Sequence, residues 1–93
     1  MKIFQSRSFK KRVKKFNKRE KSHLDDEVRK IVENPTIGVE KKGDLKGIFV
    51  HKFKVKKALY LLSYRSVIEG IELITIGSHE NYYRDLKSYL KNR

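Results

Sequence analysis

Three apolar runs in the second half of the chain constrain its fold more than any other feature. Residues 48–55, 58–64 and 71–76 are short, rich in branched and aromatic side chains, and separated by polar or glycine-containing links. Such runs predict β-strands. Their links, residues 56–57 and 66–70, are too short for a crossover connection. We therefore expect an antiparallel meander.

The first part of the chain changes from alternating to helical spacing. Residues 2–5 hold one apolar pair and predict a short edge strand. From Ser8 onward, apolar side chains recur at the spacing of one helix face, at Phe9, Val13 and Phe16. We expect this helix to run to about Lys21, with basic residues over the rest of its surface.

A second helix is expected from Ser22 to Asn34. Ser22 can act as its N-cap, and Asp25 and Asp26 place negative charge in its first turn. Pro35 disfavours the helical conformation in the residue before it and ends the helix. The glycine-rich residues 36–47 predict a loop that returns the chain to the sheet.

Together these elements predict one α+β domain over residues 1–93, because a chain of 93 residues can bury only one core. Its expected fold is an N-terminal helical hairpin packed on an antiparallel sheet of three to four strands. A C-terminal helix is expected over residues 79–91. Its apolar stripe is Tyr82, Leu86 and Tyr89.

The net charge of +13 indicates a polyanionic or strongly acidic partner. Residues 1–22 carry ten basic residues against one acidic residue, and residues 35–57 carry seven against two. A lysine-rich surface that only aids solubility is the alternative. The second basic block falls on an expected strand, where lysine is disfavoured, and this favours contact with nucleic acid.

Composition also limits the chemistry. The chain has no cysteine, and its three histidines lack the spacing of metal ligands. No run is long enough to span a membrane, and the N-terminus lacks the apolar region of a signal peptide. We expect a cytoplasmic protein without a metal, a small-molecule cofactor or a membrane partner.

Two lysines of the first long strand share a face. Alternation places Lys52 and Lys54 opposite the face of Phe49, His51 and Phe53, which should cover the helices. The two lysines then lie about 7 Å apart along the strand. Either an anion lies between them or both extend into water.

Residues 77–83 join the last strand to the last helix. Ser78 can cap this helix, whose free N–H groups form an anion site. His79 follows directly and can act as an acid or a base on a bound phosphate. A capped helix with a surface histidine explains the same residues.

Three segments of the chain, in this order, resemble the RelE/ParE superfamily of toxins from type II toxin–antitoxin systems, in its RelE/YafQ-like branch. Residues 44–47 look like the family's Leu-x-Gly before the sheet. Residues 51–55 resemble the alternating lysines, and residues 77–83 the ending with glycine, a small residue and histidine. The resemblance implies a metal-independent, ribosome-dependent mRNA endoribonuclease, in which a ribose 2′-OH attacks the adjacent phosphate.

The resemblance also implies site residues. His79, Lys52 and Lys54 match family positions, and Tyr83 matches the aromatic residue that orients the nucleotide, with Tyr82 as the competing choice. Base and acid are not assigned between His79 and a lysine. Leu61 stands where RelE has an arginine, and Arg65 or Lys57 is expected to supply that cation to the RNA phosphate, together with the anion site at Ser78.

Besides a silenced toxin relic, which would be harmless without its antitoxin, two other functions remain open, and each implies different partners. A ParE-like toxin has a similar fold without the nuclease residues and inhibits DNA gyrase. A non-catalytic RNA- or ribosome-binding module would bind through the basic first helix and the tyrosine pair. For the leading hypothesis, the expected partners are mRNA, the ribosome and a cognate antitoxin with an acidic segment.

Overall fold

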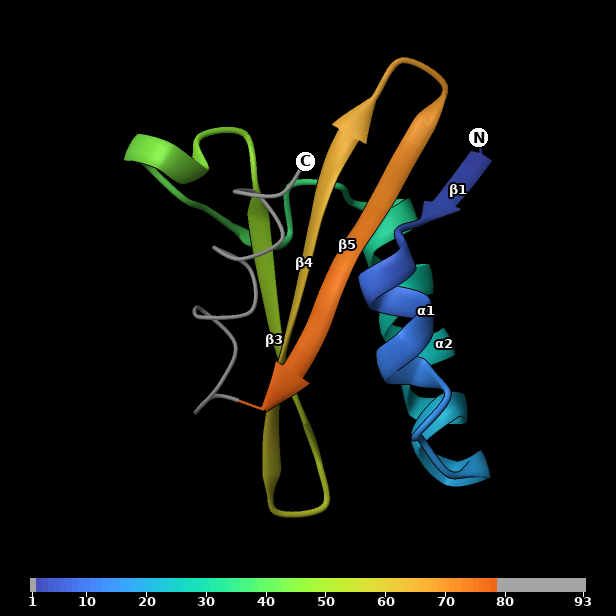
Figure 1. Cartoon of the computed structure of the whole chain (residues 1–93). Helices are drawn as coiled ribbons and strands as arrows, with labels where there is room; N and C mark the ends of the chain where they lie inside the picture. Colours follow the sequence, from blue (N-terminus) through green and yellow to red (C-terminus); the bar gives the residue numbers. More distant parts are fainter. Residues whose placement is uncertain (1, 79–93) are drawn as a thin grey trace.

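The computed structural model describes residues 2–78, which form helices packed against a sheet (Figure 1). The elements are β1 (Lys2–Gln5), α1 (Arg7–Val13), α2 (Lys18–Glu33), β2 (Val39–Glu40), a 3-10 turn (Gly43–Leu45), β3 (Phe49–Val55), β4 (Ala58–Val67) and β5 (Gly70–Ser78). The α+β class and the N-terminal helical pair are therefore confirmed. The predicted C-terminal helix lies outside the described residues.

The sheet has five strands in the order β1-β5-β4-β3-β2 and is mixed. The predicted sheet of three to four antiparallel strands is wrong in both respects. β1 pairs in parallel with β5, and the helices and other strands between them in sequence provide the crossover connection. β2 is a two-residue strand paired with β3 inside the predicted loop. The edge position of β1 is confirmed.

The first helix is shorter than predicted and the second begins earlier. α1 ends at Val13, and Asn17 caps α2 through a reciprocal pair of hydrogen bonds with Glu20, both 2.8 Å long. This capping box bonds backbone N–H groups at the start of α2. In one continuous helix, those groups would already be bonded within the helix. Ser22, the predicted cap, lies inside α2. Phe16 still packs against the core, but from the link between the helices.

The face of the sheet toward the helices carries the larger apolar cluster. Phe53 and Val55 of β3 pack there with Phe9 of α1 and with Leu24 and Ile31 of α2. The predicted orientation of β3 is thus confirmed. On the opposite face lies a smaller cluster. It contains Ile48, Val50, Leu61 and Ile74, with Leu45 packed against it.

A β-bulge in β5 changes which of its residues face the helices. Tyr64 is paired with Leu73, whereas the preceding Ser63 is paired with Thr75, so Ile74 is the extra residue. The Ser63 hydroxyl accepts a hydrogen bond from the Thr75 N–H and donates one to the Thr75 carbonyl, each 3.2 Å long. Beyond the bulge, the alternation of side chains along β5 is reversed.

The hairpin between β4 and β5 is tighter than the sequence predicts. β4 continues through Val67, so only two residues, Ile68 and Glu69, connect it to β5. Gly70 is required at the start of β5, because an added Cβ would lie 1.9 Å from the carbonyl oxygen of Lys2. Within residues 2–78 no helix has both the length and the apolar character needed to cross a membrane.

Candidate RNA-binding site

Lys52 and Lys54 extend from β3 on the face opposite the helices. Both are exposed, whereas their neighbours Phe53 and Val55 are buried. Lys52 is paired with Leu61 and Lys54 with Leu59 on β4. Neither ammonium group has an ion-pair or hydrogen-bond partner within the part of the chain that the structure describes. Within residues 2–78 these two cations share one strand face without an ion-pair partner, so they can bind an anionic ligand.

A largely buried polar contact on the other face of β3 holds this strand against α2. His51 Nε2 lies 2.7 Å from Glu27 Oε1, and Lys30 Nζ lies 2.9 Å from Glu27 Oε2. Burial raises the pKa of Glu27, but the hydrogen bonds and charges of His51 and Lys30 outweigh it, so its pKa is lowered. His51 is also stacked on Phe53, with ring centroids 6.0 Å apart. The strand that presents the lysines is therefore fixed by helix contacts.

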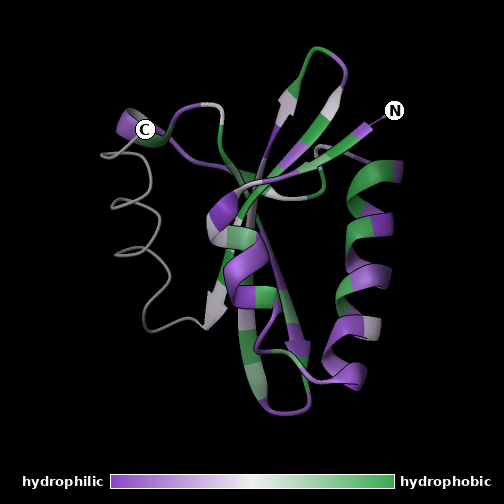
Figure 2. Ribbon diagram, turned by 45° about the vertical axis from the view of Figure 1, so that its right-hand side comes forward, coloured by the Kyte–Doolittle hydropathy of each residue, from purple (hydrophilic) through white to green (hydrophobic). Residues whose placement is uncertain are grey.

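Lys57 lies in the two-residue turn between β3 and β4, at the Lys54 end of the sheet. The adjacent Lys56 has a left-handed backbone, with φ of 57°. This turn is purple in Figure 2, because its residues are hydrophilic. The turn borders a hollow against the start of α2, where Tyr60 donates a 3.1 Å hydrogen bond to Glu20. Burial, the hydrogen bond and the charge of Glu20 raise the pKa of Tyr60.

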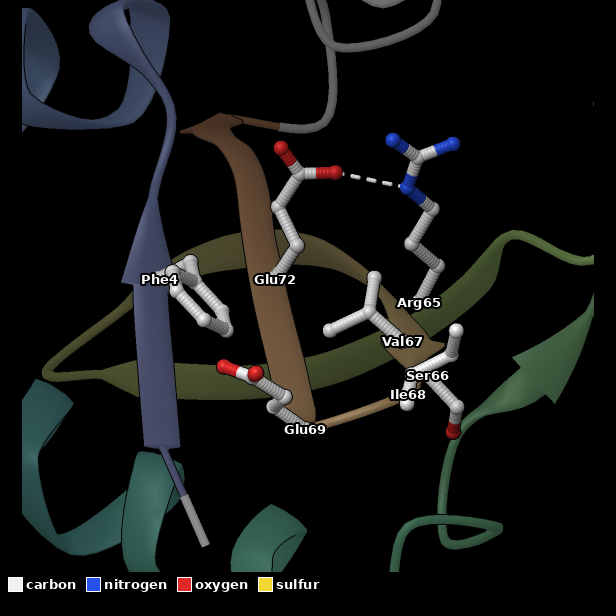
Figure 3. A pocket seen from close by; sticks show the side chains of 7 residues that line it. All are labelled: Phe4, Arg65, Ser66, Val67, Ile68, Glu69 and Glu72. Atoms are coloured by element: carbon white, nitrogen blue, oxygen red, sulfur yellow. Dashed lines mark hydrogen bonds and ion pairs between the residues drawn. The ribbon is translucent and has the colours of Figure 1, made fainter.

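Arg65 lies toward the opposite end of the sheet from the turn at Lys57. Its Nε donates a 2.6 Å hydrogen bond to Glu72 Oε1 in a partly buried ion pair (Figure 3). Arg65 follows Leu61 by four residues, which corresponds to about 13 Å of strand. It lines a hollow with residues from β1, β4 and β5. The structure therefore does not bring Arg65 together with the lysine pair.

The remaining predicted residues adjoin or lie beyond the end of the described chain. Ser78 is exposed, ends β5 and is paired with Tyr60. His79, Tyr82 and Tyr83 lie outside the described residues. Ser78 is thus a strand residue, and its predicted role as a helix cap involves residues that the structure does not describe.

Arg12 of α1 reaches the same face of the sheet as Lys52 and was not singled out from the sequence. Lys52 is paired with Leu61, and Leu61 with Gly77, so these three residues form one row across the sheet. A Cβ built on Gly77 would lie 3.9 Å from Arg12 Nη1. In sequence Arg12 is one of many basic residues on the first helix, and no local pattern places it beside Gly77.

The described part of the site contains cationic side chains but no cluster of metal ligands. Among residues 2–78, no three His, Asp or Glu side chains gather as potential metal ligands. Lysine and arginine side chains can bind a phosphate and stabilise the negative charge that develops on it during transfer. The arrangement therefore fits an anionic ligand such as a phosphate group.

Comparison with known proteins relates the chain to toxins. A family model described as ParE-like toxin of type II bacterial toxin–antitoxin system matches residues 3–87. A mutant of E. coli toxin RelE in the free state has a TM-score of 0.70 and 18% identity, and the match covers 98% of this chain and 94% of that chain. A comparison with curated proteins gave no significant match.

Two further solved structures have a similar fold. The isolated E. coli RelE toxin has a TM-score of 0.63 and 20% identity, with 92% of this chain and 95% of that chain covered. A chain of the intact E. coli RelBE toxin–antitoxin complex has a TM-score of 0.63 and 19% identity, with 81% of this chain and 92% of that chain covered. At these identities the likeness shows the fold alone.

Proposed function

Because this chain belongs to the ParE-like toxins of type II bacterial toxin–antitoxin systems, we propose that it acts as an mRNA endoribonuclease on the ribosome. It has a RelE-like fold. One observation carries the nuclease proposal. Lys52 and Lys54 lie unpaired by other described residues on one face of β3, and Gly77 of β5, which precedes the last described residue, shares that face. A phosphate bound by the lysines would lie near the end of β5.

In the proposed reaction the ribose 2′-oxygen forms a bond to the adjacent phosphorus, and the bond from phosphorus to the 5′-oxygen breaks. One group removes the 2′-OH proton and another protonates the leaving 5′-oxygen, which gives a cyclic phosphate and a 5′-OH. His79 and one lysine of the pair share these two roles. The other lysine stabilises the added negative charge on the phosphate.

Other predicted residues hold the RNA. Tyr83, or Tyr82 in its place, stacks on or orients a base, since every base presents an aromatic face. Ser78 belongs to the anion site at the end of β5. Lys57 adds charge at the Lys54 end of the sheet, where it contacts a neighbouring phosphate.

The proposed protein partner is a cognate antitoxin. The similar E. coli toxins include chains solved in complex with an antitoxin and with an antitoxin RelBc peptide. An acidic antitoxin segment that covers Lys52 and Lys54 would neutralise the two cations and exclude RNA from the same face. This partner also explains how a cell tolerates the active protein.

Growth arrest and mapped mRNA ends test the proposal. Expression of the chain should produce new mRNA 5′ ends within codons, and Lys52→Ala with Lys54→Ala, or His79→Ala, should abolish them. The matched control is Lys42→Ala with Lys46→Ala, which removes two exposed lysines from the loop before β3. Cuts that persist in the Lys52/Lys54 variant would contradict the proposed site.

Inhibition of DNA gyrase is the second candidate function. Leu61 stands where RelE-type nucleases have an arginine, and the matching family model is described as ParE-like. If expression arrests growth without new mRNA ends, and DNA breaks that depend on gyrase accumulate instead, the chain is a gyrase inhibitor.

A further inference from the structure

We propose that Arg12, projecting from α1 over Gly77, supplies the cation whose family position is occupied by Leu61. This inference rests on the proposed nuclease function. Arg12 is then a phosphate-binding residue of the site, contributed by a helix and not by the strand that carries Leu61. Three independent features of the fold place it there.

The first feature is the attachment of α1 along the edge of β5. β1 pairs with β5 only as far as Leu73. The chain then continues as α1, held by a 3.0 Å hydrogen bond from Ser6 N to the Leu73 carbonyl and by a hydrogen bond from the Ser6 hydroxyl to the Ile74 carbonyl. α1 therefore lies beside the part of β5 that, among residues 2–78, has no strand neighbour on this side (Figure 1).

The second feature is a match of spacing between α1 and β5. Ser8 Oγ lies 3.0 Å from Thr75 Oγ1, which sets the helix against the strand at that level. Arg12 is one helix turn beyond Ser8, about 6 Å along the axis. Gly77 is two residues beyond Thr75, about 6.6 Å along the strand. The distance from Ser8 to Arg12 along α1 is therefore close to the distance from Thr75 to Gly77 along β5, so Arg12 reaches the level of Gly77.

The third feature is the bulge at Ile74. Without the extra residue, strand alternation would place Gly77 on the same face as Leu73, toward the helices. With it, Gly77 is paired with Leu61 and shares the face of Leu61 and Lys52. A Cβ at Gly77 would lie 3.9 Å from Arg12 Nη1, so the guanidinium reaches this face at the rim of the sheet.

The absence of a side chain at Gly77 gives the guanidinium its space. The backbone of Gly77 is not in the left-handed region, so its conformation does not require glycine. A methyl group would make ordinary van der Waals contact with Arg12, whereas the two γ-carbons of valine would extend farther into the volume beside the guanidinium. Gly77 thus permits Arg12 to occupy the row that contains Leu61.

An arginine fits this role for a chemical reason. Its planar guanidinium can donate two parallel hydrogen bonds to one phosphate, and it stays charged throughout the accessible pH range. Lys52 lies two strands away from Gly77, about 10 Å between backbones, on the same face. Lys52 and Arg12 therefore flank Leu61 and can approach one RNA backbone from two sides.

Two readouts test the inference. Single-turnover cleavage of mRNA on programmed ribosomes and affinity for a 2′-O-methyl RNA, which cannot be cut, should be measured for Arg12→Gln, Arg12→Lys and Gly77→Val. We expect Arg12→Gln to lower the cleavage rate about 100-fold and to weaken RNA binding. Arg12→Lys should lower the cleavage rate roughly 10-fold, because lysine keeps the positive charge but lacks the planar guanidinium that donates two parallel hydrogen bonds.

The matched control is Lys10→Gln, which removes one exposed positive charge from the opposite side of α1. This variant should stay within about twofold of the parent, as expected for one distant surface charge. Because Gly77→Val acts by displacing Arg12, Gly77→Val combined with Arg12→Gln should be no worse than Arg12→Gln alone. Thermal unfolding identifies any variant that fails to fold.

The outcomes separate this inference from the proposed function. If the parent cuts mRNA and Arg12→Gln cuts as well as Lys10→Gln, the inference is overturned and the nuclease function stands. If the parent cuts no mRNA, the nuclease function fails, and the binding measurement decides on Arg12. Equal RNA affinity of folded Arg12→Gln and Lys10→Gln would then overturn the inference, whereas weaker binding by Arg12→Gln alone would support it.

Discussion

His51 on β3 and Glu27 on α2 form a largely buried hydrogen bond, with Nε2 and Oε1 2.7 Å apart, directly behind the exposed Lys52. The side chains of His51 and Glu27 are only 11% and 14% exposed. The pair joins the helix layer to the strand that presents the lysines. Loss of this contact is therefore expected to affect stability and the precision of the site together.

The first prediction is acid sensitivity through Glu27. Its pKa is lowered in the folded protein, so its contribution to stability is present above the ordinary glutamate value and is lost as the pH falls through the folded value. Glu27→Gln should flatten the decline of the unfolding free energy below the ordinary glutamate pKa value of about 4.5. Urea denaturation between pH 3 and pH 7 measures this, and Glu33→Gln, an exposed glutamate of the same helix, is the control. Parallel pH profiles for the two variants would contradict the assignment.

The second prediction concerns Tyr64, which is fully buried. Its hydroxyl donates a 2.7 Å hydrogen bond to the Pro35 carbonyl and accepts a 3.0 Å hydrogen bond from the Gly38 N–H. Tyr64→Phe should lower the unfolding free energy by about 1–3 kcal/mol, because it leaves both backbone groups without this partner. Tyr60→Phe, which loses a single hydrogen bond to Glu20, should lower it less. Equal losses in the two variants would show that the buried hydrogen bonds of Tyr64 contribute no more to stability than the single hydrogen bond of Tyr60.

The third prediction tests where α2 begins. Asn17→Ala removes the N-cap and should cost about 1 kcal/mol of stability. Ser22→Ala lies inside the helix, where alanine is the better helix former, so it should be neutral or slightly stabilising. Chemical denaturation of the two variants gives both values. A larger loss at Ser22 than at Asn17 would restore the helix boundary expected from the sequence.

The fourth prediction compares the two cations expected to compensate for Leu61. Lys57 lies at the Lys54 end of the sheet, whereas Arg65 lies toward the other end and is paired with Glu72. Lys57→Gln should therefore lower mRNA cleavage several-fold, and more than Arg65→Gln does, because a phosphate contact contributes only near the bound strand. Rates on programmed ribosomes decide the order. Greater loss in Arg65→Gln would place the RNA across the hollow beside β1.

Some of this structure could be predicted from the sequence, because local patterns determine it. Two-residue alternation in β3 is sufficient to place Lys52 and Lys54 opposite Phe53, and the structure confirms this orientation. Likewise the period of the apolar residues Phe9 and Val13 predicts a helix in that place, which the structure contains. These features depend on residues close together in sequence.

Other features depend on contacts between distant segments and have weak local patterns. The parallel pairing of β1 with β5 follows from the path of the whole chain, and β2 is too short to show alternation. The bulge at Ile74 is marked only by Ser63, a polar residue that meets it across the sheet. Since this bulge decides the face of Gly77, the position of Arg12 could not be predicted. The helix boundary was missed for another reason, because Phe16 continues the apolar period past the end of α1.

The chemistry of the cut RNA end tests the proposed reaction directly. Messenger RNA bound to a programmed ribosome should yield a 2′,3′-cyclic phosphate with the parent protein. It should yield none when the nucleotide at the cut is 2′-deoxy, or when Lys52→Ala is combined with Lys54→Ala. Cleavage that persists with the 2′-deoxy nucleotide, or that survives loss of both lysines in a folded protein, would contradict the proposed reaction and its site.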